Sequence, residues 1–115
     1  MNDDKRQKSD TTDGQPPRPG FENAAAPAPL NPRTGQHEAY WVLSKEERGK
    51  GFVRPVRQRY RHLTCGVVTH MGLALAETYA RDPKFYGATF CVECRTHFPV
   101  VEFVWTDGSE ETLGT

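Results

Sequence analysis

The chain has no long hydrophobic run, no net charge and few cysteines, and each of these absences excludes a class of protein. No apolar stretch in the 115 residues approaches the roughly 20 that a membrane-spanning helix needs. The polar N-terminus carries no secretory signal. Three cysteines, an odd number, do not suit a domain held together by disulfides alone. We therefore expect an intracellular, cytoplasmic protein with reduced thiols and no membrane partner.

The residue patterns of common catalytic sites are also missing. The sequence shows no Ser/His/Asp arrangement, no pair of catalytic carboxylates and no glycine loop for a phosphate. It also lacks the His-x-Glu and Pro-Cys-x2-Cys pattern of nucleobase deaminases. No small-molecule substrate is evident. We therefore expect a protein that is not an enzyme.

The N-terminal segment is poor in aromatic residues and rich in proline. Phe21 is the single aromatic residue among the first 32, and six of the nine prolines lie there. Residues 23–32 have the Pro/Ala composition of an extended linker. Such a segment cannot bury enough apolar surface to offset the loss of chain entropy. We expect residues 1–36 to form a disordered arm and residues 37–115 to form one small domain.

A domain of this size gains only about 3–5 kcal/mol from its core, and natural domains this small often bind a structural metal. The three cysteines and one histidine form two pairs, His62-x2-Cys65 and Cys91-x2-Cys94, and these pairs use every cysteine in the chain. Gly66 follows the first pair and suits a tight ligand loop. Paired ligands two residues apart, with a long gap between the pairs, are typical of one tetrahedral zinc ion. The sequence therefore predicts a single structural Zn²⁺.

The histidine ligand has rivals. His62 forms a pair that mirrors the two cysteines, whereas His97 follows Cys94 at the same spacing and is the alternative fourth ligand. His70 comes third, and His37 lies in the expected linker. A redox pair formed by Cys91 and Cys94 is a second alternative reading. A redox cysteine works best at a helix N-terminus, and the proline five residues after Cys94 disfavours a helix there.

The hydrophobic patterns predict short elements. Apolar or alternating runs indicate strands at 40–43, 52–61, 88–91 and 100–105. Ser44 and Glu47 form a capping box for a short helix that ends at Gly49. Residues 71–81 carry apolar positions at the spacing of an amphipathic helix, with Thr69 as its expected N-cap. We expect an α+β fold, stabilised by zinc, with zinc-ribbon-like loops, short antiparallel strands and one main helix.

The distribution of charge is uneven although the total is zero. The segment 48–61 has six basic residues and no acid, while residues 96–115 have four acids and no base. The basic segment is a candidate surface for a phosphate backbone or for a protein partner, and its members are Arg48, Lys50, Arg54, Arg57, Arg59 and Arg61, with Tyr60 as a stacking residue. A charged edge strand that prevents aggregation is the plainer interpretation. Because the whole chain is neutral, we favour a protein partner, with nucleic acid as the alternative.

The metal-binding part resembles a known group of proteins. The run from Cys65-Gly-Val-Val-Thr-His-Met-Gly72 through Phe90-Cys-Val-Glu-Cys94 to His97-Phe-Pro-Val-Val-Glu-Phe-Val-Trp105 is similar to small phage and bacterial zinc-ribbon-like proteins. The resemblance covers about residues 40–110. It implies a compact zinc-binding domain and implies no activity.

Overall fold

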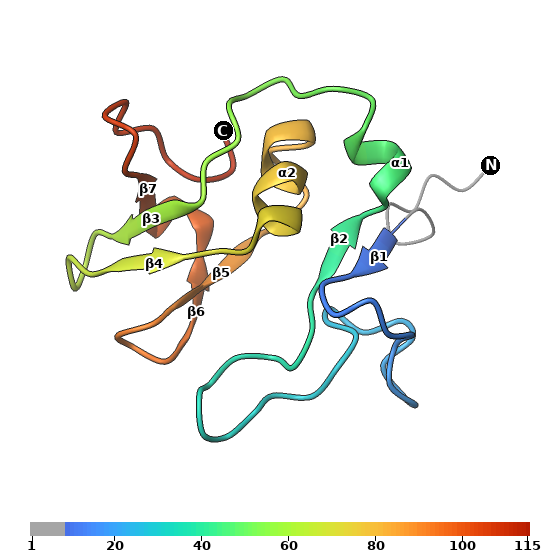
Figure 1. The fold of residues 1–115 in the computed structure, drawn as a ribbon. Coiled ribbons are helices and arrows are strands. Elements are labelled where there is room, and N and C mark those ends of the chain that lie inside the picture. The colour runs from blue at the N-terminus through green and yellow to red at the C-terminus, as the bar shows by residue number, and fades with distance from the viewer. Residues whose placement is uncertain (1–8) are drawn as a thin grey trace.

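The fold mixes short strands with one main helix (Figure 1). A computed structural model describes residues 9–115, so residues 1–8 of the predicted arm lie outside the described part. In chain order the elements are β1 (Ser9–Thr11), β2 (Trp41–Leu43), α1 (Lys45–Arg48), β3 (Arg59–His62), β4 (Val68–His70), α2 (Leu73–Arg81), β5 (Ala88–Cys91), β6 (Thr96–Pro99), the 3₁₀ helix η2 (Val100–Glu102) and β7 (Phe103–Trp105). The predicted α+β class with one main helix is confirmed.

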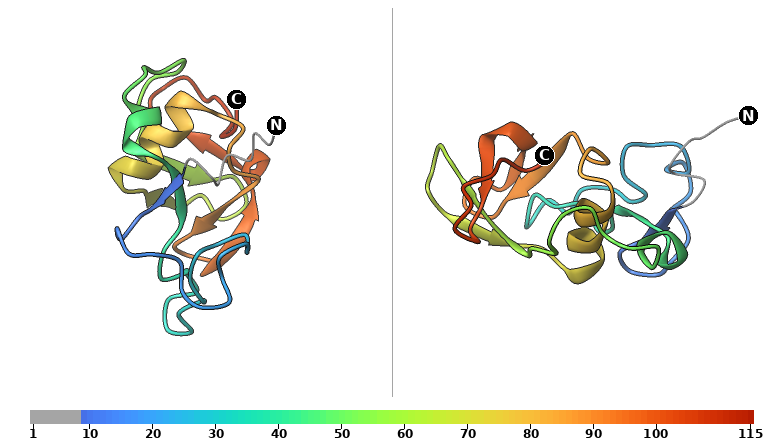
Figure 2. Two further views of the ribbon diagram at one scale, coloured as in Figure 1. Left: turned by 90° about the vertical axis from the view of Figure 1, so that its right-hand side faces the viewer. Right: turned by 90° about the horizontal axis from the view of Figure 1, so that it is seen from above.

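The strands form three small antiparallel sheets. Strand β3 lies between β4 and β7, β5 pairs with β6, and β1 pairs with β2. Figure 2 shows the pair β1–β2 on one side of α2 and the other two sheets on the opposite side. In the three-stranded sheet, Tyr60 lies opposite both Thr69 and Trp105. This arrangement brings the ends of β3 and β5, which precede the two ligand loops, to one part of the molecule.

Helix α2 supplies one wall of the core. It buries Ala76 and Tyr79 against a cluster that includes Phe103, Trp105 and Leu113. Ala76 and Tyr79 belong to the predicted helix, and Phe103 and Trp105 belong to the predicted strand at 100–105. The helix begins two residues later than expected, with Gly72 as its N-cap, because Thr69 takes part in β4 instead. The backbone N–H of the C-cap residue bonds to the carbonyl of Thr78 at the predicted end.

The short helix α1 has the predicted cap. The hydroxyl of Ser44 accepts a hydrogen bond from the backbone N–H of Glu47 at 3.2 Å. The backbone N–H of Gly49 then bonds to the carbonyl of Lys45 at 3.0 Å and closes the single turn. Ser44 is therefore the N-cap, as predicted, and this bond is the Ser44 half of the predicted capping box.

Two of the predicted strands are only partly present. In segment 52–61 only residues from Arg59 onward form a strand, and Pro55, which has no N–H for a ladder, lies in the part that does not. The expected alternation fails before Arg59: Arg57 is 8% exposed, whereas Val56 is 39% exposed. In segment 100–105, η2 precedes β7. The hairpin of β5 with β6, which positions the second ligand loop, was not predicted.

The segment between β1 and β2 lies beside the rest of the molecule. Ala26 and Ala28 are buried, and the indole N–H of Trp41 donates to the carbonyl of Ala24 at 3.0 Å. The disorder expected for residues 1–36, and the boundary at residue 36, stay predictions. Within residues 9–115, no helix is long and apolar enough to cross a membrane.

Candidate metal centre

Two loops bring one histidine and three cysteines together. His62 is the last residue of β3 and Cys65 follows in the first loop, while Cys91 ends β5 and Cys94 follows in the second loop. Their ligand atoms all lie within 4.8 Å of one another, so this group could hold a metal ion. All three cysteines are free thiols. The group contains the four residues that the sequence paired, although they come from separate sheets.

The distances fit the chemistry of a tetrahedral zinc site. Zinc–sulfur bonds of about 2.3 Å place two sulfur ligands roughly 3.8 Å apart, and a sulfur and a nitrogen ligand roughly 3.6 Å apart. In the structure the sulfurs of Cys65 and Cys91 are 3.6 Å apart. The sulfur of Cys94 lies 3.7 Å from Nδ1 of His62. Neither spacing would have to change much to admit one ion.

The two ligand loops have the same backbone geometry. The backbone N–H of Gly66 bonds to the carbonyl of His62 at 2.7 Å, and that of Arg95 bonds to the carbonyl of Cys91 at 2.8 Å. Both residues that close the loops adopt positive φ, 76° for Gly66 and 59° for Arg95. Arg95 therefore takes the left-handed conformation that glycine adopts more readily. The second loop forms without the glycine that the first loop contains.

A hydrogen bond fixes the orientation of the His62 ring. Its Nε2 lies 3.0 Å from Oε1 of Glu102, so the ring donates there and directs Nδ1 toward the cysteines. The ring is 1% exposed and packs against the rings of Phe98 and Phe103, each with its centroid 4.6 Å away. A carboxylate behind a ligating imidazole sets the tautomer and strengthens the nitrogen as a donor.

Glu102 is a candidate site residue that the sequence did not reveal. The sequence contained no signal for it, because it lies 40 residues from His62. Its position follows from the antiparallel pairing of β3 with β7, in which His62 lies opposite Phe103, the neighbour of Glu102.

The pKa values reflect the crowding of the ligands. Burial alone would raise the pKa of Cys91, but hydrogen bonds from the backbone N–H groups of Cys94 and Glu93 and from the Cys65 side chain lower it overall. Desolvation and the sulfurs of Cys91 and Cys65 raise the pKa of Cys94 to about 11. For His62, burial lowers the pKa, and hydrogen bonds to Glu102 and Cys65 outweigh burial and raise it. Three sulfurs this close cannot all lose their protons without a cation between them.

The other histidines lie outside this group. Nε2 of His97 lies 2.7 Å from the hydroxyl of Tyr40, and its ring is 5.5 Å from the ring of His37. His70 is exposed in β4. The structure therefore places the rival histidines away from the cysteines, while the ligand assignment itself stays a prediction.

The basic segment 48–61 is largely neutralised by acids of this chain. Within the described part, five of its six cations form ion pairs: Arg48 with Glu77, Lys50 with Glu47, Arg54 with Glu111, Arg57 with Glu111 and Asp107, and Arg61 with Glu110. No ion pair within residues 9–115 involves Arg59. The acidic C-terminal end thus lies against the basic segment.

Two predicted surface residues of that segment are buried. Arg57 donates to Glu111 at 2.7 Å and packs its guanidinium 4.6 Å from the centroid of the Trp105 ring. Tyr60 is 3% exposed, and its hydroxyl donates to the carbonyl of Phe90 at 2.6 Å. Tyr60 therefore contributes to the core and offers no face on which a base could stack.

Comparisons with protein-family models, with curated proteins and with solved structures found no match for this chain.

Proposed function

We propose that this protein is a non-enzymatic zinc-binding module whose single Zn²⁺ is structural. The convergence of four donor atoms within 4.8 Å, from loops 26 residues apart, carries the proposal. The ligands would be Nδ1 of His62 and the sulfurs of Cys65, Cys91 and Cys94. A compact group of three thiolates and one imidazole suits zinc better than magnesium or calcium, which prefer oxygen ligands.

The module acts without catalysis in this proposal. Four protein ligands complete a tetrahedral shell and leave no position for a reactive water. The carboxylate nearest in sequence to the cysteines, Glu93, is exposed, and Glu102 is already bonded to His62. The role of the ion is to hold the two loops together, because its binding free energy, about 10–16 kcal/mol in small zinc peptides, also drives folding.

Exposed apolar side chains beside the ligand loops support a protein as the partner. Leu63, Val92 and Val101 are 56%, 50% and 66% exposed. The backbone N–H of Leu63 bonds to the carbonyl of Glu102 at 2.9 Å, so Leu63 lies close to Val101. Val92 belongs to the second ligand loop. Exposed apolar side chains near the ligand loops favour contact with another protein.

The paired charges of segment 48–61 make nucleic acid the weaker alternative. A phosphate backbone would have to compete with Glu110, Glu111 and Asp107 for the same guanidinium groups. Binding of random oligonucleotides by the zinc-loaded chain, with an affinity that falls steeply as salt is added, would favour the alternative.

Elemental analysis and native mass spectrometry test the metal. We expect one zinc per chain, and cooperative folding of the metal-free chain would refute a structural role. For the surface, the matched variants are Leu63→Asp in the first ligand loop and Val53→Asp, which is 65% exposed at the far end of α2. A genuine partner should bind the wild type and the Val53→Asp variant, and its binding to the Leu63→Asp variant should be lost. Equal binding of both variants would place the partner surface elsewhere.

A further inference from the structure

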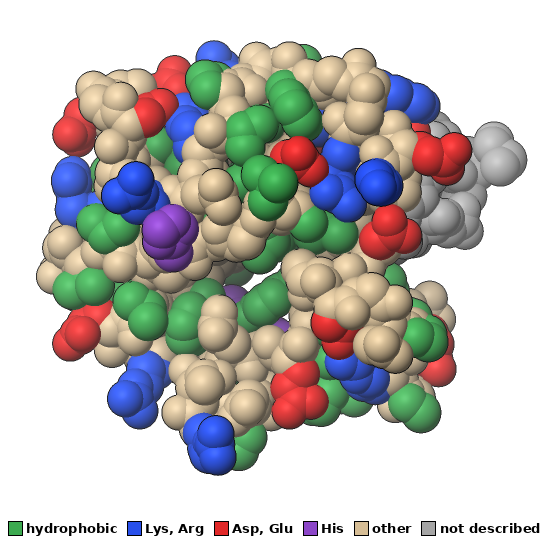
Figure 3. Space-filling model, in the orientation of Figure 1, with side chains coloured by type: hydrophobic (Ala, Val, Ile, Leu, Met, Phe, Trp, Pro, Cys, Tyr) green, Lys and Arg blue, Asp and Glu red, His purple; other side chains and the backbone are tan. Residues whose placement is uncertain are grey.

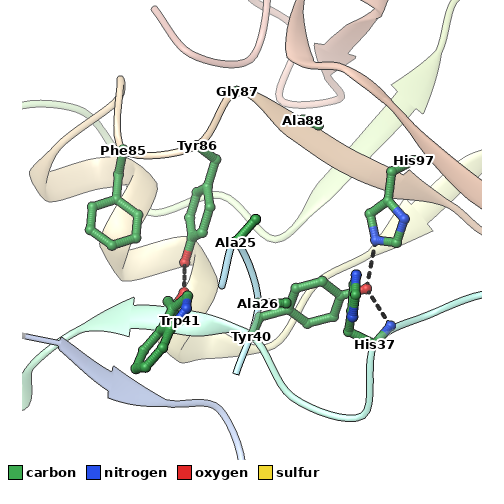
Figure 4. A pocket seen from close by; sticks show the side chains of 10 residues that line it. All are labelled: Ala25, Ala26, His37, Tyr40, Trp41, Phe85, Tyr86, Gly87, Ala88 and His97. Carbon is green, nitrogen blue, oxygen red and sulfur yellow. Dashed lines mark hydrogen bonds between the residues drawn. The ribbon is translucent and has the colours of Figure 1, made fainter. Parts of the chain in front are cut away.

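A cavity of about 610 Å³ lies between the N-terminal segment and the rest of the molecule. Its walls include Tyr40 and Trp41 at the start of β2, Tyr86 after α2 and His97 in β6 (Figure 4). Figure 3 shows the surface hollowed in the middle of this face, with histidine side chains visible in its depth. The volume falls within the range of about 300–1,000 Å³ that small-molecule sites occupy.

The cavity has no charged lining among the described residues. Its lining contains no Asp, Glu, Lys or Arg, and neither does that of the adjoining cavity of about 280 Å³, which shares Tyr40, Tyr86, Ala88 and His97 with it. Charged residues make up 26% of the chain, so this absence is a marked feature. A charged molecule would lose its hydration here without gaining an ionic partner. The lining therefore selects uncharged ligands.

A hydrogen-bond chain sets the proton positions. The hydroxyl of Tyr40 accepts from the backbone N–H of His37 at 3.0 Å, so its own proton is available to Nε2 of His97, 2.7 Å away. Nδ1 of His37 lies 2.7 Å from the carbonyl of Ala28 and must donate to it. Nε2 of neutral His37 is left as an acceptor with no hydrogen-bond partner among the described residues.

The aromatic walls offer ring faces and edges more than polar groups. The indole N–H of Trp41 is taken by the carbonyl of Ala24, and the hydroxyl of Tyr86 donates to the carbonyl of Trp41 at 2.5 Å. Phe85 packs edge-on against Tyr86, with ring centroids 4.8 Å apart. With their polar ends occupied, these side chains suit stacking against a planar ring.

We propose that this cavity binds an uncharged, planar heteroaromatic molecule of about two fused rings, which stacks on the aromatic walls and donates an N–H to Nε2 of His37. This site is separate from the metal centre, because none of His62, Cys65, Cys91 and Cys94 lines either cavity. It does not depend on the proposed zinc function beyond the need for a folded chain.

The test uses three probes and the zinc-loaded full chain. Quinazolinone is planar and uncharged with an N–H donor, quinoline carboxylate is a planar anion, and cyclohexanecarboxamide is uncharged without an aromatic ring. We expect quinazolinone to produce saturable shifts of the Trp41 indole signal in two-dimensional NMR, at concentrations at least tenfold below any effect of the other two. No saturable shift, or equal binding of the anion, would overturn the proposal.

Variants locate the site. Ala25 lines the cavity and is itself exposed, so Ala25→Trp should fill the space without disturbing the core and should abolish the shifts. His37→Phe keeps a ring but removes the acceptor, and we expect about tenfold weaker binding. The control is Phe52→Ala, an exposed aromatic residue that lines neither cavity. The Trp41 indole signal of each free variant reports whether the fold is kept. Wild-type binding by Ala25→Trp would also overturn the proposal.

Discussion

Glu102 accepts a hydrogen bond from Nε2 of His62 at 3.0 Å, while Nδ1 of the same ring faces the sulfur of Cys94. The carboxylate would thus act on a bound metal through the imidazole. Replacement of such a partner usually lowers metal affinity by about 10–100-fold. We expect Glu102→Gln to weaken zinc binding by that amount in a competition with a chromophoric chelator.

The matched control for this prediction is Glu93→Gln. Glu93 lies between the two cysteines of the second loop but is exposed, so its loss of charge should change affinity much less. Equal weakening in both variants would mean that net charge, and not the orientation of the ring, governs affinity.

Removal of the metal should unfold the domain. The structure has only short strands and one main helix, so the two ligand loops have little else to hold them together. We expect excess chelator to abolish the dispersion of amide signals for residues 40–113, and added zinc to restore it. A well-dispersed spectrum in the presence of chelator would contradict this expectation.

Substitution can show which of two histidines, His62 or His97, is the metal ligand. His62→Ala should lose the zinc ion in native mass spectrometry, because its Nδ1 lies 3.7 Å from the sulfur of Cys94. His97→Ala should retain one zinc per chain, because Nε2 of His97 is bonded to Tyr40. Loss of zinc from His97→Ala alone would reverse the ligand assignment.

Contact between the N-terminal segment and the second ligand loop can be tested at a glycine. A Cβ added at Gly35 would lie 2.0 Å from the carbonyl oxygen of Arg95. Gly35 and Gly14 both have positive φ, so alanine at either position costs about 1–2 kcal/mol of backbone strain. Gly35→Ala should cost about 1–3 kcal/mol more because of the overlap, measured by denaturant unfolding of the zinc-loaded protein.

Gly14→Ala is the control, because nothing lies within 4 Å of a Cβ at that position. Similar destabilisation in the two variants would show that residues near Gly35 do not pack against Arg95 in solution.

The titration of His97 should be displaced to low pH. Burial, and then the neighbouring His37, lower the pKa of His97 below the ordinary value of 6.5. Because the folded pKa is depressed, the favourable contribution of neutral His97 is complete above pH 6.5 and is lost as the pH falls from there toward the folded pKa. NMR titration of the ring C–H signals should give a value below 6.5 in the zinc-loaded protein.

Substitution of His37 should raise the pKa of His97. His37→Gln removes the neighbouring imidazole, which lowers the pKa of His97 by an electrostatic effect. An unchanged titration in this variant would assign the shift to burial alone.

The spacing of His62 and the three cysteines in the sequence was enough to predict the candidate metal-binding group. Each pair of donors depends only on the local geometry of its tight loop, and His62 and Cys91 each end a strand. The main helix was also readable, since its apolar positions recur at helical spacing and bury Ala76 and Tyr79. Local pattern is sufficient where the stabilising contacts are close in sequence or where the residue types allow few alternatives.

Tertiary structure decided what depends on distant pairing. Antiparallel pairing of β3 with β7 set Glu102 behind His62, across 40 residues. The same sheet placed Trp105 beside Arg57, which turned an expected surface cation into a buried, ion-paired residue. Which residues face each other across a sheet, and which charges become buried there, depends on the strand that pairs. The residues of one strand do not specify which other strand that is.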